Sequence, residues 1–251
     1  MSTLTYTRYE MVRLLRNKQS LIFSLAFPIV MYFLLAGPNK DNHNFGGDKQ
    51  HPTGLFAPQY YMTGLLAFGA MVAVLSGGAR IAAERTIGWN RMLRLTPLTA
   101  RSYLRTKVIT GYVLAGTGIV LLYAAGISLG VRLGIGQWAE MTGLVLVALI
   151  PFAALGTGGG HLLNDDAAGP ALGGGVSLFA FLGGTWFPIT GSGFFTQFCQ
   201  LLPSYWLVQA GHVGLGGGNP WGLKAWLVIA VWSVAGAVFA MWAYRRDTRR
   251  A

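Results

Sequence analysis

Apolar runs long enough to cross a lipid bilayer recur along this chain, and they constrain its fold more than any other feature. The six runs lie at residues 21–36, 60–79, 108–131, 138–163, 167–187 and 223–244. Crossing a bilayer core takes about 20 residues of helix, so each run is close to the required length. In lipid, a helix satisfies its own backbone hydrogen bonds. We therefore predict an all-α integral membrane protein with six transmembrane helices.

The balance of apolar and charged residues excludes a soluble domain. Hydrophobic types make up 53% of the chain and charged types only 11%, whereas a soluble domain carries about 25% charged residues. The net charge of +11 would suggest a nucleic-acid partner in a soluble protein. Here the basic residues stand in short segments between apolar runs, which indicates membrane topology and contact with anionic lipid instead.

Three basic segments set the orientation that we predict. They are residues 80–107, the C-terminal stretch 245–250 and the N-terminal stretch 1–19. With six spans all three fall on one side of the membrane, which the positive-inside rule assigns to the cytoplasm. Both termini are then cytoplasmic. The loop at 164–166 carries Asp165 and Asp166 on the same side, but acidic residues weigh little in this rule.

Two further segments are expected to lie in the membrane without crossing it, within a single transmembrane domain covering residues 1–251. Residues 1–19 combine basic and apolar positions at helical spacing, which favours an interfacial amphipathic helix. A solvated basic tail, or a signal peptide that includes the first apolar run, remains an alternative. Residues 188–222 are too apolar for an aqueous loop, and we interpret them as short re-entrant helices on the extracytoplasmic side.

Small residues four apart are candidate contacts between helices, notably Gly156 with Gly160 and Gly169 with Gly173. Because the chain contains 36 glycines, such spacings also arise by chance.

No catalytic or metal-binding pattern stands out. His43, His51, His161 and His212 lack ligand spacing, and Cys199 has no partner for an intrachain disulfide. We see no acidic residue at the centre of a span, where a proton- or sodium-coupled carrier usually has one. The energy for any transport must then come from elsewhere.

The cytoplasmic segment 84–97 is the most specific part of the chain. It reads as a short charged helix that follows the second span, and Pro97 disfavours helical backbone at Thr96. A helix projecting from a membrane bundle in this way can fit a groove on a soluble partner. A solvated helix at the membrane surface is the plainer alternative.

Two groups of motifs carry a resemblance to a known family. The first comprises Glu84-Arg85, Gly88, Arg91-Met92-Leu93 and Thr96-Pro97-Leu98, and the second comprises residues 184–189 with Leu202-Pro203 and Tyr205-Trp206. In order and spacing, they resemble the permeases of type-2 ABC exporters, among which drug and antibiotic efflux is common. Trp89-Asn90 departs from the small and acidic residues expected there.

The resemblance implies a transport subunit that is not itself an enzyme. ATP and magnesium would bind a separate ABC ATPase on the cytoplasmic side, and a second permease copy, identical or different, would complete the unit. The chain would lie in a bacterial plasma membrane and need no cofactor of its own. The coupling residues would be Glu84, Arg85, Gly88, Arg91, Met92, Leu93, Leu95, Thr96 and Pro97.

The cargo class is less defined. A pathway with few charges suits a hydrophobic or amphipathic substrate, such as a drug, an antibiotic or a lipid-like molecule, and its lining residues are not identified. The alternatives are a proton-coupled carrier acting alone, a subunit exporting lipid-linked glycans, and an intramembrane enzyme or scaffold.

Overall fold

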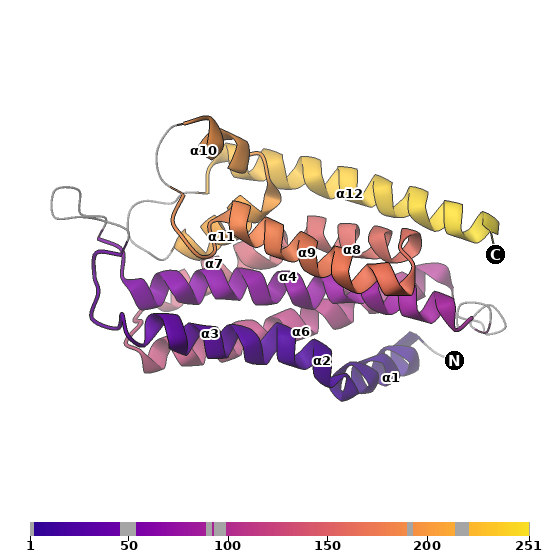
Figure 1. Ribbon diagram of the computed structural model, residues 1–251, viewed down its shortest axis with the longest axis horizontal. Coiled ribbons are helices and arrows are strands. Elements are labelled where there is room, and N and C mark those ends of the chain that lie inside the picture. Colours follow the sequence, from indigo (N-terminus) through magenta and orange to yellow (C-terminus); the bar gives the residue numbers. More distant parts are fainter. Residues whose placement is uncertain are drawn as a thin grey trace.

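The structure, a computed structural model, describes residues 3–45, 54–88, 92, 99–189, 193–213 and 221–250. All regular elements in these ranges are helical, as predicted. They are α1 (Thr3–Arg16), α2 (Lys18–Leu21), the π-helical turn η1 (Ile22–Ala26), α3 (Phe27–Ala36), α4 (Ala57–Thr86), α6 (Ala100–Ser128), α7 (Ile135–Ala148), α8 (Ile150–Leu162), α9 (Asp165–Gly183), α10 (Phe194–Cys199), α11 (Pro203–His212) and α12 (Leu223–Arg250). The long helices lie side by side, roughly along the long axis of the molecule, and run alternately in opposite directions (Figure 1).

Four stretches of the described chain are long and apolar enough to cross a membrane. They lie in α4, in α6, in the continuous pair α7–α8 and in α12, and they correspond to the second, third, fourth and sixth predicted runs. The first run lies in a shorter apolar helix, Ile22–Ala36. The fifth lies in α9, whose hydropathy is lowered by Asp165, Asp166 and several glycines. The chain is thus an all-helical membrane protein by length and composition.

Helix α4 forms the centre of the bundle. It contacts α3, α6, α8, α9 and α11, and most of its apolar stretch is buried. Pro58 lies in its first turn, where the missing backbone N–H removes no intrahelical bond. The helix continues to Thr86, beyond the apolar run that we predicted to end at residue 79. This extension brings Arg80 and Glu84 to one end of the bundle while both remain buried.

Glycines allow α4 and α8 to approach each other closely. A Cβ at Gly78 of α4 would collide with the carbonyl oxygen of Gly156, and one at Gly160 with that of Gly78. The predicted helix contact at Gly156 and Gly160 is therefore confirmed. The second predicted pair is not, because a Cβ at Gly169 or Gly173 of α9 would meet no atom within 4 Å.

Two apolar helices contain an interruption of regular α-helical backbone. Pro151 lies in the first turn of α8, directly after the junction at Leu149 that joins α7 to α8. Proline removes a backbone donor and bends a helix at such a point. The turn η1 precedes Pro28 of α3 and interrupts the first apolar helix with a wider π-helical turn. The sequence pattern did not reveal this turn.

The two segments predicted to lie along the membrane contain helices. In α1, Tyr6, Glu10 and Leu14 form the face buried against the bundle, and the helix contacts α6. Within 188–222, α11 packs against α4, α7 and α9, whereas α10 leaves Phe194 and Phe195 exposed. The short helices are present as predicted.

Candidate coupling site

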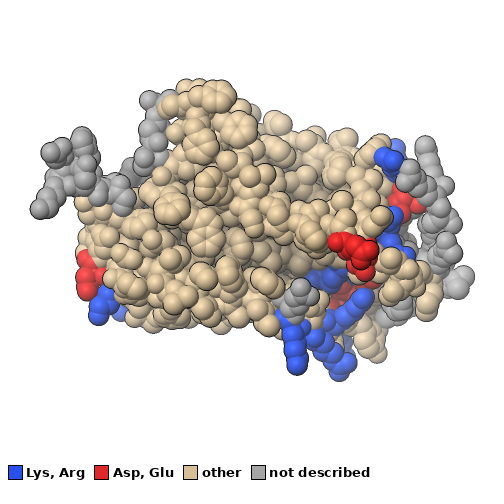
Figure 2. All heavy atoms as spheres, viewed as in Figure 1, with Lys and Arg blue, Asp and Glu red and all other residues tan. Residues whose placement is uncertain are grey.

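Charged side chains gather at the ends of the bundle, and the middle of the visible face is uncharged (Figure 2). Helix α1 and the C-terminal end of α12 lie at the same end (Figure 1). The last turns of α4 and the first turns of α6 also lie there, and they contribute the residues of the site. This end therefore brings together the segments that the sequence marks as basic.

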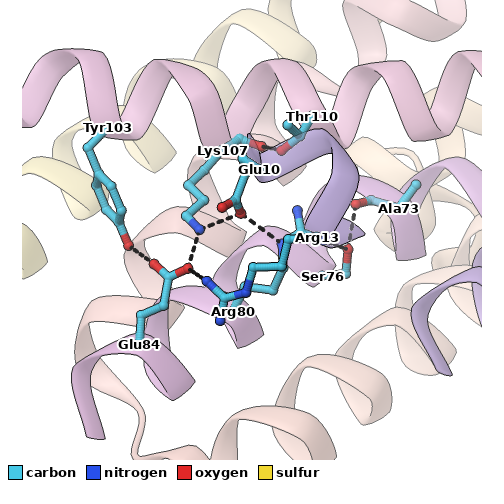
Figure 3. A network of polar contacts seen from close by, with 9 residues as sticks. All are labelled: Glu10, Arg13, Ala73, Ser76, Arg80, Glu84, Tyr103, Lys107 and Thr110. Carbon is cyan, nitrogen blue, oxygen red and sulfur yellow. Dashed lines mark hydrogen bonds and ion pairs between the residues drawn. The ribbon is translucent and has the colours of Figure 1, made fainter. Parts of the chain in front are cut away.

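Glu84 is the centre of a buried ion cluster, and its side chain has no exposed surface. Its Oε1 accepts hydrogen bonds from Lys107 Nζ and from Arg13, each at 2.5 Å. Its Oε2 accepts a hydrogen bond from the Tyr103 hydroxyl at 2.6 Å. Glu84 thus joins α4 to α1 and α6 (Figure 3).

Glu10 extends the cluster from α1. Its Oε1 lies 2.5 Å from Lys107 Nζ and 3.7 Å from Arg80 Nε. The Lys107 side chain is only 1% exposed and contacts both carboxylates. Removing charges from water is unfavourable, so such a group persists only when opposite charges and hydrogen bonds compensate it.

Helical spacing explains how α4 and α6 each supply two of these groups. Arg80 and Glu84 are four residues apart on α4, and Tyr103 and Lys107 are four apart on α6. Residues with this spacing lie on one face of a helix. Thr99 caps α6 by accepting a hydrogen bond from the Ser102 backbone N–H at 3.3 Å, which starts that helix at the charged end.

Arg85 points to a second cluster on the other side of α4. One of its terminal nitrogens lies 2.8 Å from Asp247 of α12, and the other donates to the carbonyl oxygens of Gly160 and Leu163. These carbonyls belong to the C-terminal end of α8, where the last carbonyl groups of a helix have no intrahelical N–H partner. Asp247 also contacts His161 Nδ1 at 2.9 Å. Arg85 therefore ties α4 to α8 and α12.

The predicted coupling segment is described only in part. Glu84 and Arg85 belong to the last turns of α4, which is continuous to Thr86, and not to a separate helix. Their side chains are held by partners within the bundle. Gly88 follows with φ of +71°, a left-handed conformation that favours glycine. Met92 is helical and 58% exposed. Arg91, Leu93, Leu95, Thr96 and Pro97 lie outside the described residues.

Sequence reasoning missed five members of the cluster. They stand within or beside the basic segments, but nothing had assigned them a role: Glu10, Arg13, Arg80, Tyr103 and Lys107. Lys107 directly precedes the third apolar run, so it was a candidate for a buried charge. A buried charge needs a partner of opposite sign, and this requirement is the signal that could have singled out Lys107. Within the described part of the chain, no group of three or more His, Cys, Asp or Glu residues could hold a metal ion.

Two comparisons with known proteins both identify membrane transport proteins as relatives of this chain. Residues 48–244 match the family model described as "ABC-2 family transporter protein". The chain is also 30% identical over 215 residues to the "Putative transport permease YvfS" of Bacillus subtilis (strain 168), in an alignment that covers 84% of each chain. The family match contains the α4 and α6 members of the ion cluster but begins after α1.

Proposed function

Since this chain belongs to the ABC-2 family of transporter proteins, we propose that it is the membrane-spanning permease subunit of an ATP-driven exporter. The family implies an ABC ATPase as partner in general terms. In our proposal that ATPase binds ATP and magnesium and docks on the cytoplasmic side. A second permease copy, identical or different, completes the translocation unit.

The observation that carries the proposal is the ion cluster at the end of α4. Glu84 stands two residues before Thr86, the last residue of α4, and its carboxylate is bonded to side chains of α1 and α6. A displacement of the segment after Ile87 would therefore be passed to three helices together. Such a rigid-body movement is one way in which a membrane bundle changes the side it opens to.

The residues that we assign to coupling then divide into two roles. Glu84 is a positioning residue, because its enclosed carboxylate acts on the docking segment through the helices that it joins. Arg85 is likewise held by Asp247 and by the end of α8. In our proposal, the direct contacts with the ATPase are made by exposed side chains such as Ile87 and Met92. Arg91, Leu93 and Leu95 are proposed to continue this surface, with Thr96 and Pro97 ending it.

The proposed topology has six crossings and both termini in the cytoplasm. It is supported by the alternating direction of the long helices and by the basic residues near the shared end of α1 and α12 (Figure 1). The first crossing would use α2, η1 and α3, and the fifth would use α9. In this topology α10 and α11 lie within the outer part of the membrane, and the membrane is the bacterial plasma membrane.

The cargo that we propose is a hydrophobic or amphipathic molecule, such as a drug, an antibiotic or a lipid-like compound. The bundle offers apolar and aromatic surfaces along most of its length. No acidic side chain of the described residues lies at the centre of a predicted span, and the two most enclosed, Glu10 and Glu84, are paired with cations. This arrangement favours ATP as the energy source over a proton-coupled carrier.

The test is reconstitution of the chain with ABC ATPases from the same organism in inside-out vesicles. We expect ATP-dependent accumulation of a hydrophobic dye with one of these ATPases and none with an ATPase whose phosphate-binding lysine is replaced. An imposed pH gradient without ATP should give no accumulation. Dye uptake driven by the gradient alone, with no ATPase present, would contradict the proposal.

A paired substitution tests the docking surface. Met92→Asp places a charge on an exposed side chain, and we expect it to weaken ATPase binding while the permease keeps its thermal stability. Ile135→Asp serves as the matched control, because Ile135 is also exposed but begins α7 at the opposite end of the bundle. Equal ATPase binding by both variants would show that Met92 is not part of the docking surface.

A further inference from the structure

Helix α10 turns its largest side chains away from the bundle. Thr196 and Cys199 form its buried face, whereas Phe194, Phe195 and Phe198 are exposed. The helix stands at the edge of the bundle beside the start of α12 (Figure 1). Exposed apolar patches of this kind mark surfaces that contact a membrane or another molecule. The outer face of α10 is thus a candidate contact surface.

A groove of about 690 Å³ lies between α10 and the first turn of α12. Binding sites for small molecules commonly have volumes of about 300–1,000 Å³. Phe194 lies at one end of α10, and Gln200 with Lys224 lies at the other, about 9 Å away at 1.5 Å per residue. Phe198 and Leu201 add to the lining. The groove therefore combines apolar walls with a polar end.

Hydrogen bonds from three side chains hold the polar end of the groove in place. Trp206 Nε1 of α11 donates to the carbonyl oxygen of Gln200 at 2.8 Å, and Trp232 Nε1 of α12 donates to that of Leu201 at 2.8 Å. Lys224 Nζ donates to Gln200 Oε1 at 2.6 Å. The end of α10 is thereby tied to α11 and α12, so the groove is formed before any occupant binds.

Lys224 is an isolated positive charge. It is the only Asp, Glu, Lys or Arg between residues 167 and 244. Its ammonium group has three donors, and no carboxylate of the described residues forms an ion pair with it. It also lies at the end of the bundle opposite the basic segments (Figure 1). By contrast Lys40, which follows α3, has Asp41 as its neighbour in the chain. Lys224 therefore lacks a negative partner within the described protein.

We propose that this groove binds an anionic phospholipid, with the lipid phosphate on Lys224 and an acyl chain along Phe194 and Phe198. A phospholipid carries its negative charge next to apolar chains, so one molecule matches both the cation and the aromatic wall. Trp221 and Trp226 stand within three residues of Lys224, and tryptophan is enriched at the level of the lipid headgroups. In the proposed topology this lipid belongs to the outer leaflet. The inference does not depend on the exporter function.

A second copy of the chain is the main rival for this surface. It would have to bring a carboxylate to Lys224 and an apolar face to α10 at the same time. Among the described residues that line the groove, Lys224 carries the only charge, so one phosphate is enough to compensate it. A free phosphate ion is the other rival, but it would leave the exposed face of α10 uncovered. The combined chemistry favours the lipid.

The first experiment tests the charge. The purified full-length chain in phosphatidylcholine nanodiscs is labelled with a small fraction of phosphatidylglycerol or phosphatidylcholine, each carrying a photoactivatable group at the same acyl position. Mass spectrometry compares labelling of residues 194–201 with that of the exposed α6 side chains Val113 and Val120. We expect the phosphatidylglycerol probe to be enriched about fivefold at 194–201 relative to α6, the ratio expected for one lysine against an anionic lipid.

Variants of the two outward lysines provide the comparison. Lys224→Gln should abolish the enrichment, and Lys224→Arg should retain most of it. Lys40→Gln is the matched control, because Lys40 is also exposed at this end of the bundle but lies outside the groove. An unchanged midpoint of thermal unfolding shows that Lys224→Gln is folded. Enrichment that persists in folded Lys224→Gln, or that Lys40→Gln removes equally, overturns the inference.

The second experiment tests the apolar wall without changing the charge. Phe198→Ser should lower labelling of residues 194–201 by both probes. Phe187→Ser is its control, because Phe187 is also exposed but does not line the groove, and it should label like the native chain. Equal labelling in the two variants overturns the assignment of the acyl chain.

The remaining outcomes separate the rivals. Unlabelled phosphatidylglycerol should displace its probe from residues 194–201, whereas millimolar glycerol 1-phosphate should not. Displacement by glycerol 1-phosphate would identify a phosphate site and overturn the lipid. Labelling of α6 by both probes with none at 194–201 would show that a second copy covers this face.

Discussion

Lys107 holds its ammonium group between two carboxylates, 2.5 Å from Glu10 and 2.5 Å from Glu84. The three groups come from α6, α1 and α4, and all are almost fully buried. Breaking one pair in such a cluster leaves a charge uncompensated, which costs more than the pair contributes on its own. The cluster should therefore fix the relative position of the three helices.

Removing the Glu84 charge tests this view. Glu84→Gln leaves three cations with one carboxylate, so we expect a loss of stability of about 3–5 kcal/mol. Thermal unfolding of the purified chain in detergent measures the change as a lower midpoint. Asp41→Asn is the control, because Asp41 is exposed beyond the end of α3 and a surface change there should stay within about 0.5 kcal/mol. Equal midpoints for the two variants would show that the cluster does not hold the helices together.

At the scale of single residues, the sequence singled out positions but did not predict their contacts. Glu84 and Arg85 were singled out by a motif, and whether they couple to an ATPase stays a prediction. Their actual partners could not be predicted, because Lys107 and Glu10 are separated by 97 residues. Periodicity tells which face of a helix a residue is on, but not which other helix covers that face.

The contact between α4 and α8 shows what small residues contribute to an element. Gly78 faces Gly156 and Gly160 so closely that a single methyl group on Gly78 would meet a backbone carbonyl. Close backbone approach of this kind stabilises helix pairs in lipid, where the hydrophobic effect does not drive association.

We expect Gly78→Ala to separate α4 from α8 and to destabilise the bundle by about 1–3 kcal/mol, the usual range for overpacking. Unfolding in detergent again provides the measurement. Gly174→Ala on α9 should keep the native midpoint or raise it, because its Cβ meets nothing and alanine favours helix. A higher midpoint for Gly78→Ala than for the native chain would refute the close contact.

The elements themselves were predicted with uneven success. The runs in α4, α6, α7–α8 and α12 were identified from hydropathy, because each is long and strongly apolar. The extension of α4 to Thr86 was missed, since its last turns carry charges that are buried only through partners on other helices. The π-helical turn η1 has no sequence signal in its apolar surroundings.

On the scale of the whole molecule, the alternation of helix directions gives the bundle two distinct ends (Figure 1). Lys40 follows α3 at one end, and Ile87 follows α4 at the other, and both side chains are exposed. Basic segments had predicted the arrangement of these ends correctly, because the rule depends on charge counts in short loops and not on detailed contacts. The number of crossings and their sidedness stay predictions.

Single cysteines test the sidedness. In a Cys199→Ala background, we expect Lys40→Cys to react with a membrane-impermeant maleimide in intact cells, and Ile87→Cys to react only in inverted vesicles. Cys199 itself is buried, so the background change leaves the labelled surface intact. Labelling of Ile87→Cys in intact cells would place the charged end outside and end the docking proposal.

The enclosed position of Glu10 has a consequence for biosynthesis. Glu10 is made early, but its partner Lys107 follows 97 residues later. At about 5–20 residues per second, the ribosome needs about 5–20 s to supply that partner. During this interval α1 cannot bury its carboxylate in its final place, so it must wait at the membrane surface while α4 and α6 are inserted. The first helix to be synthesised is in this sense among the last to reach its native position.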